Sequence, residues 1–97
     1  MDMQVENMQV ENIISDKGNI VPNQFIVTSE KGRYFQSYDS IICFINKNND
    51  IFLDSETWNY SRTTSKYRNI FLNEDTKTTK KNISSGKYIL ANLNKDK

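Results

Sequence analysis

The sequence has no histidine, one cysteine, one proline and three glycines among its 97 residues. Without histidine, the acid–base, catalytic-triad and metal-binding chemistry that depends on an imidazole is excluded. The single cysteine, Cys43, leaves no ligand set for structural zinc. The glycines at 18, 32 and 86 are too far apart for a phosphate-binding loop. We therefore predict no catalytic residue, no metal site and no cofactor, and we expect a protein that is not an enzyme.

Long hydrophobic runs are also missing. The longest is IICFI at residues 41–45, five residues against the roughly 18 that are needed to cross a bilayer. Residues 1–12 are polar and acidic, unlike a secretory signal peptide. Cys43 lies within the apolar run, where a buried and unreactive thiol is expected. These features predict a soluble, intracellular protein that does not interact with a membrane.

Charge is distributed unevenly, although the net charge is only +1. Residues 1–60 contain four Lys/Arg against nine Asp/Glu, whereas residues 61–97 contain nine Lys/Arg against three Asp/Glu. One interpretation is that the basic half presents an electropositive face to an acidic partner. The other is that the two halves attract each other, either within the fold or between the subunits of a homo-oligomer. The sequence leaves both open.

The N-terminus contains a tandem duplication, with MQVEN at residues 3–7 and again at 8–12. Two copies are too few for a repeat architecture, and a period of five residues fits neither a helix nor a strand. We therefore predict a flexible arm over residues 1–17, a single folded domain over 18–94 and a tail over 95–97. We assign no function to the duplication.

Strand signals begin after Gly18. Segments rich in β-branched and aromatic residues are separated by the turn clusters EKG at 30–32 and KNND at 47–50. A continuous apolar run such as SIICFIN fits a strand that is buried on both faces, or a short buried helix. The expected strands cover residues 23–30, 33–38, 40–46, 51–54 and 87–93.

The period changes after Asp54. Tyr60, Thr64, Tyr67 and Phe71 recur at intervals of four, three and four, which predicts a helix over residues 63–72 with an inward stripe. A second helix is predicted over 75–85, capped by Asp75 or Thr76 and followed by Gly86 in a left-handed conformation. Trp58 is expected to pack beneath the first helix. The fold class is therefore α+β, a mostly antiparallel sheet of about five strands with two short helices between the fourth and the last strand.

Six cations in and around the two predicted helices are the candidate partner-binding residues. Cations attract phosphates in a salt-dependent manner, and exposed aromatic rings stack on bases, so nucleic acid is one candidate partner. A solvated helix face has the same pattern, and this alternative stays open. The candidates are Arg62, Lys66, Arg68, Lys77, Lys80 and Lys81.

Three segments carry a resemblance to a known group of proteins: SYDSIICFI at 37–45, IFLDSETWNYSRTTSKYRNIFL at 51–72 and TKTTKKNISSGKYILANLN at 76–94. The chain resembles a family of small uncharacterised proteins that phages and other mobile elements carry in low-GC bacteria. The resemblance covers residues 33–94 and assigns no role to any residue. It implies a setting in the cytoplasm of a bacterial host cell, where small phage proteins often inhibit host proteins, as anti-CRISPR proteins do.

Together these observations lead to three hypotheses. The first is a non-enzymatic phage or mobile-element protein that inhibits a bacterial defence system, as anti-CRISPR proteins do. It would bind stoichiometrically to an effector protein, such as a CRISPR effector, or to its nucleic-acid channel. The second is a nucleic-acid-binding accessory protein that contacts phosphates through its basic C-terminal half. The third is a subunit that self-associates through its oppositely charged halves.

Overall fold

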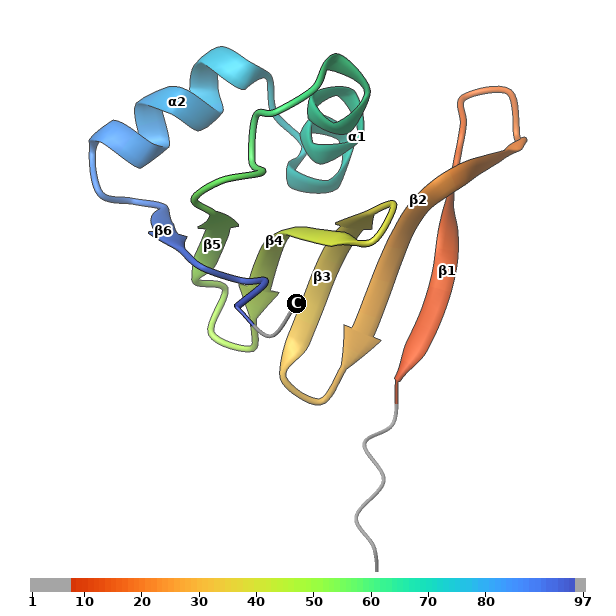
Figure 1. The fold of residues 1–97 in the computed structure, drawn as a ribbon, viewed down its shortest axis with the longest axis horizontal. Coiled ribbons are helices and arrows are strands. Elements are labelled where there is room, and N and C mark those ends of the chain that lie inside the picture. The colour runs from red at the N-terminus through yellow and green to blue at the C-terminus, as the bar shows by residue number, and fades with distance from the viewer. Residues whose placement is uncertain (1–7, 96–97) are drawn as a thin grey trace, which may run out of the picture.

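The computed structural model describes residues 8–95 and contains six strands and two helices (Figure 1). The strands are β1 (Gln9–Ile14), β2 (Ile20–Ser29), β3 (Gly32–Ser37), β4 (Ser40–Asn46), β5 (Ile51–Asp54) and β6 (Ile89–Ala91). The helices are α1 (Arg62–Leu72) and α2 (Thr76–Ser84). Among residues 8–95, no helix has the length and apolar content needed to cross a bilayer.

The six strands form one sheet in the order in which they occur in the chain. Each pair from β1 to β5 is antiparallel and is joined by a short turn. The last pair, β5 and β6, is parallel because α1 and α2 intervene and bring the chain back in the same direction. The predicted α+β class, with helices placed before the last strand of a mostly antiparallel sheet, is confirmed, but the sheet has six strands instead of five.

The additional strand corrects the predicted N-terminal arm. Residues 9–14 are not an arm but form β1, which pairs with β2 through Val10 opposite Val27 and buries Ile13. Ser15 donates its N–H to the carbonyl of Asn19 at 2.8 Å and closes the turn between the two strands. The sequence of this segment, QVENII, does not alternate regularly between apolar and polar residues, so it gave no clear strand signal. The rest of the predicted arm before Met8, and the last two residues of the predicted tail, lie outside the described residues.

Both helices lie on one face of the sheet (Figure 1), and the core lies between the two layers. Phe71 of α1 packs against Phe35 of β3 with ring centroids 6.0 Å apart. In β4 the pairing register shifts opposite Phe35, and both Ile42 and Cys43 are fully buried. Burial raises the pKa of the Cys43 thiol far above its ordinary value, as expected for an unreactive cysteine.

The helix ends follow from local sequence. The side chain of Ser61 accepts a hydrogen bond from the N–H of Thr64 and caps α1, and Asn73 ends that helix in the left-handed conformation with φ 58°. Asp75 caps α2 by accepting from the N–H of Thr78 at 2.7 Å. Gly86 follows α2 with φ 82°, as predicted.

The inward stripe of α1 differs at its start from the predicted one. Thr64 and Phe71 are buried, and Tyr67 packs against the core while staying partly exposed. Tyr60 is 51% exposed because it precedes the first helical residue, so the helical period does not apply to it. Trp58 packs partly buried against the core, as expected.

Candidate functional site

Five of the six predicted cations are exposed on the two helices, and we call this group the helical cation surface. On α1, Arg62 and Lys66 are one turn apart on the side opposite Thr64 and Phe71, which face the core. Both helices lie on the same side of the sheet (Figure 1), so the cations belong to one layer of the molecule. The helical cation surface consists of Arg62, Lys66, Lys77, Lys80 and Lys81.

The second helix turns its cations outward because its inner face is anchored by Thr79. The Thr79 hydroxyl is fully buried and donates to Oε2 of Glu74 at 2.6 Å. Ile83, four residues later, packs against the core. Lys77 and Lys81 are one turn apart on the opposite side of this short helix.

The two acids between residues 61 and 88 make hydrogen bonds within the fold, while seven Lys/Arg lie in the same stretch. Glu74 accepts from the Tyr88 hydroxyl at 2.5 Å as well as from Thr79. Burial, together with this bond to Glu74, raises the pKa of Tyr88 to about 12. Asp75 caps α2, and the hydrogen bonds from Thr78 lower its pKa. The helical layer is therefore rich in cations, and its acids are occupied by structural roles.

Arg68 corrects the predicted set of partner-binding residues, because its side chain is fully buried. Its guanidinium donates to the carbonyl of Trp58, to Oδ1 of Asn69 at 2.8 Å and to Oγ1 of Thr76 at 2.8 Å. It also lies 5.2 Å from the centroid of the Trp58 ring. Arg68 thus joins the segment before α1 to the start of α2, and it is not available to a partner.

Lys66 illustrates the opposite case on the same helix. Its ammonium group lies 5.3 Å from the centroid of the Tyr67 ring, yet the residue stays exposed. The attraction between a cation and an aromatic face positions the lysine side chain, while the ammonium group stays charged and accessible to solvent. Within the helical cation surface, Lys66 therefore has a side chain that an aromatic neighbour helps to position.

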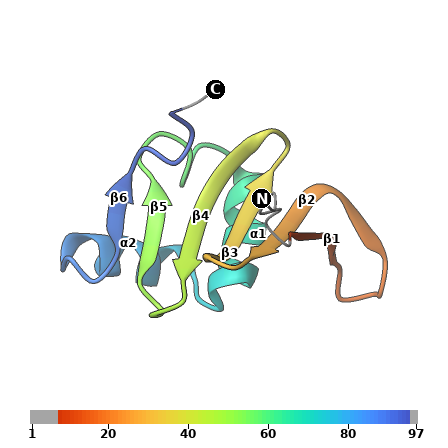
Figure 2. The same cartoon turned by 90° about the horizontal axis from the view of Figure 1, so that it is seen from below.

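The opposite face of the sheet is a feature that the sequence reasoning missed. Neither α1 nor α2 covers it, and in Figure 2 the strands lie in front of both helices. Cross-strand partners share a face, so the pairing places one apolar residue of every strand in a single row. The row runs Val10, Val27, Tyr34, Phe44, Phe52 and Ile89. We call this side of the sheet the open face.

Aromatic rings stack along the middle of the open face. The rings of Tyr34 and Phe44 stack with centroids 4.3 Å apart, and Phe44 and Phe52 follow at 6.0 Å. The signal was present in the sequence, since RYFQ, CFIN and IFLD each alternate a ring with an inward residue. It was not recognised because an apolar run reads equally well as a strand that is covered on both faces.

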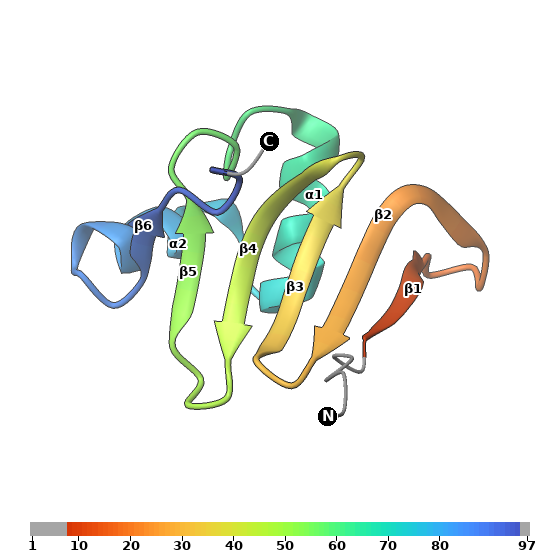
Figure 3. The same ribbon diagram turned by 60° about the horizontal axis from the view of Figure 1, so that its bottom comes forward.

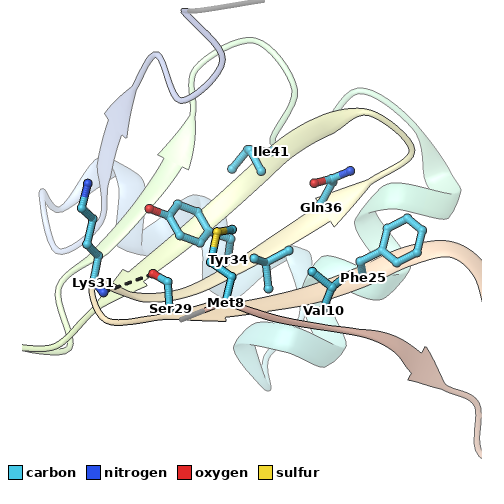
Figure 4. Close-up of a pocket in the computed structure, with 9 residues that line it drawn as sticks. Met8, Val10, Phe25, Ser29, Lys31, Tyr34, Gln36 and Ile41 are labelled. Carbon is cyan, nitrogen blue, oxygen red and sulfur yellow. Dashed lines mark hydrogen bonds between the residues drawn. The ribbon is translucent and has the colours of Figure 1, made fainter. Parts of the chain in front are cut away.

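A groove of about 410 Å³ lies on the open face between β1 and β4 (Figure 4). Met8 and Val10 form one side, and Tyr34 and Ile41 come from the neighbouring part of the sheet. Of the nine residues within 8–95 that line the groove, only Lys31 is charged, and its backbone N–H donates to the Ser29 hydroxyl at 3.1 Å. The groove offers an apolar surface to a partner and almost no charge.

A third cluster, around Asp54, has a structural role. Oδ1 of this buried carboxylate accepts from the N–H of Leu93 at 2.7 Å, and Oδ2 accepts from the N–H and the hydroxyl of Thr57. Burial opposes the ionisation of Asp54, but these hydrogen bonds outweigh it, so the pKa lies below its ordinary value. Asn94 completes the attachment of the C-terminal segment by pairing with the backbone of Ile41. Within the described part of the chain, no group of three or more Cys, Asp or Glu residues could hold a metal ion.

Comparison with known proteins identifies a family but no characterised relative. Neither the search of curated proteins nor the search of solved structures finds a match. Residues 8–89 match a family described as "Family of unknown function (DUF8033)". The matched region begins with the second MQVEN copy and extends from β1 to the first residue of β6. The chain therefore belongs to the DUF8033 family of proteins of unknown function.

Proposed function

We propose that the protein is a non-catalytic binding protein that acts by stoichiometric occupation of an acidic surface on a partner, with the helical cation surface as the contact. The observation that carries the proposal is the division of charge in the helical layer. Five cations project outward from α1 and α2, whereas Glu74 and Asp75 accept hydrogen bonds within the fold. An outward cationic layer attracts an acidic partner and accelerates its association.

The narrower form of the proposal concerns the partner. The sequence resemblance suggests an inhibitor of a bacterial defence system, of the anti-CRISPR type, that works in the cytoplasm of a bacterial host. In that setting the cations would face an acidic protein surface of the effector, or the nucleic acid held in its channel. This identification rests on the resemblance alone and stays a prediction.

Free nucleic acid is the second candidate partner. The exposed ring of Tyr60 precedes Arg62, so one aromatic residue and the cations could engage a single strand together. Against this, Trp58 and Tyr67 pack on the core, which removes two of the three rings that stacking would use. Nucleic acid would then be held mainly through its phosphates, and binding would weaken steeply as salt increases.

The experiment reverses the charge of two exposed residues of α1, as Arg62→Glu with Lys66→Glu. The matched control is Lys17→Glu with Lys47→Glu, which makes the same change in net charge at two exposed turn residues. The wild type and each variant are used to capture partners from a bacterial extract, and the mass of each captured complex is measured. We expect a complex of fixed stoichiometry that the α1 reversal removes and the control retains. A complex that survives the α1 reversal, or that both variants weaken equally, would overturn the proposal.

A labelled 20-nucleotide single strand separates the two candidates. If phosphates are the target, the wild-type protein binds this strand without any other partner, and the logarithm of its affinity falls linearly with the logarithm of the salt concentration, with a slope of roughly −0.7 per phosphate contacted. If a protein surface is the target, the strand binds weakly and the captured complex contains a protein at equal stoichiometry.

A further inference from the structure

The open face is unusual for a protein that works as a monomer. A sheet normally buries its apolar face against another layer, and the helices satisfy this requirement on only one side (Figure 3). At the two ends of the row, Val10 is 62% exposed and Ile89 is 45% exposed. Between them Val27 is buried among its neighbours, and the stacked rings of the row are half-buried. A contiguous apolar surface of this kind marks an interaction site.

The near absence of charge on the open face restricts the partner. Ladder positions of β1 to β4 on this face carry apolar or neutral polar side chains, and Lys31 lies in the turn at the edge of the groove. Asp54 of β5 shares this face with Phe52, but it is buried, and its carboxylate accepts hydrogen bonds from Leu93 and Thr57. A polyanion such as nucleic acid would find few cations here. Fully buried centres of protein interfaces, in contrast, are depleted of charge and enriched in aromatic residues and methionine.

The same property makes the open face compatible with itself. A two-fold axis places identical patches against each other, so a patch of one charge sign repels its own copy, whereas a neutral apolar patch does not. The helical cation surface therefore cannot form such a contact, and the open face can. Two sheets packed face to face at about 10 Å, with strands roughly 30° apart, form a β-sandwich core.

The size of the open face is sufficient for such a contact. Six strands spaced about 4.8 Å apart span about 24 Å, and a six-residue strand is about 20 Å long. The footprint is therefore on the order of 500 Å² on each copy, and two copies together cover roughly 1,000 Å², the size at which specific interfaces begin.

We propose that two copies of the chain pack open face against open face and form a two-fold symmetric dimer. The stacked rings of Tyr34, Phe44 and Phe52 lie at its centre, and the groove beside β1 receives side chains of the second copy. The helices then lie on the two outer sides, and both helical cation surfaces stay accessible. The dimer uses no residue of those surfaces, so it stands independently of the proposed function.

The test is the mass of the protein in solution as a function of concentration. Sedimentation equilibrium from low micromolar to near millimolar concentration should show the mass rising from 11.4 kDa to twice that value. Val10→Glu with Ile89→Glu places two carboxylates in the interface at residues that are exposed in a single copy, and we expect dimerisation to weaken by about 100-fold or more. Ile70→Glu is the matched control, because Ile70 is 50% exposed but lies on α1, and this variant should dimerise like the wild type.

Salt distinguishes this dimer from one that is held by the oppositely charged halves of the chain. An apolar interface keeps its affinity or gains affinity as salt increases, whereas an interface between acidic and basic surfaces weakens. A monomer at every concentration would overturn the proposal. So would a dimer that dissociates at high salt, or one that the Ile70 variant weakens as much as the open-face variant does. Circular dichroism of each variant confirms that the fold is retained.

Discussion

Arg62 and Arg68 lie on the same helix and have opposite roles. Arg62 is exposed, whereas Arg68 is buried and donates to acceptors on the preceding segment and on the start of α2. Both were predicted from the sequence to bind a partner, because both are cations that lie between aromatic residues. Helical spacing separates them, since Arg68 is four residues after the buried Thr64 and three before the buried Phe71. The spacing therefore predicts that Arg68 faces the core, although most arginines in proteins are exposed.

We expect Arg68→Ala to lower the free energy of unfolding by about 3 kcal/mol, because it removes a fully buried side chain and leaves several partly buried acceptors without this donor. Arg62→Ala, on the same helix, should change it by no more than about 0.5 kcal/mol, as is usual for an exposed side chain. Urea denaturation of the two variants measures both values. Equal decreases in the free energy of unfolding would show that the hydrogen bonds of Arg68 do not stabilise the helical layer.

Asp54 gives the fold a defined pH dependence. Its pKa is lower in the folded protein than in the unfolded chain, so the ionised carboxylate stabilises the fold above about pH 4. This stabilisation is lost as the pH falls through the folded-state pKa. We expect Asp54→Asn to reduce stability at neutral pH by about 1–3 kcal/mol and to flatten the decline in acid. Thermal unfolding between neutral pH and acid measures this, with Asp16→Asn in an exposed turn as the control. An unchanged acid profile in the Asp54 variant would contradict the role.

At the scale of elements, the sequence predicted what local chemistry determines. Caps and turn residues located both helices to within one or two residues, and β-branched segments located β2 to β5. The shorter β6 covers Ile89–Ala91 because the following residues turn away to bond with Asp54 and Ile41. β1 was missed because its register depends on pairing with β2, which no local signal reports.

Gly32 shows how closely two of these elements approach. A Cβ atom there would lie 2.1 Å from the carbonyl oxygen of Ile45 in β4, and φ is 144°. Gly86 also has positive φ, 82°, but the space around it is open. We expect Gly32→Ala to destabilise the fold by more than about 3 kcal/mol, and Gly86→Ala by about 1 kcal/mol, the cost of the left-handed backbone alone. The denaturation midpoints of the two variants measure these losses of stability. Equal losses would mean that β3 and β4 can move apart at Gly32 without a loss of stability.

At the scale of the whole molecule, the two layers present surfaces of different chemistry. The helical layer is outwardly cationic, and the open face of the sheet is apolar and nearly uncharged. Charge counting located the first surface from the sequence. The second could not be located in that way, because the sequence does not say which face of a strand the helices cover. The aromatic row is left uncovered by helices because α1 and α2 both pack on the other face of the sheet.

Because the two surfaces are on opposite sides, each can be removed without the other. We expect Val10→Glu with Ile89→Glu to yield a monomer that still binds an acidic partner, with lower avidity where the partner offers two sites. Partner affinity measured at concentrations below and above dimerisation checks this. A monomeric variant with no partner binding at all would show that the two surfaces are coupled.

The most direct measurement is native mass spectrometry of the protein together with the partner captured from a bacterial extract. The wild type should carry that partner at fixed stoichiometry. Reversal of charge at Arg62 and Lys66 should remove the partner while the protein itself stays folded and keeps its own oligomeric state. A partner that remains bound to this variant at the wild-type ratio would contradict the assignment of binding to the helical cation surface.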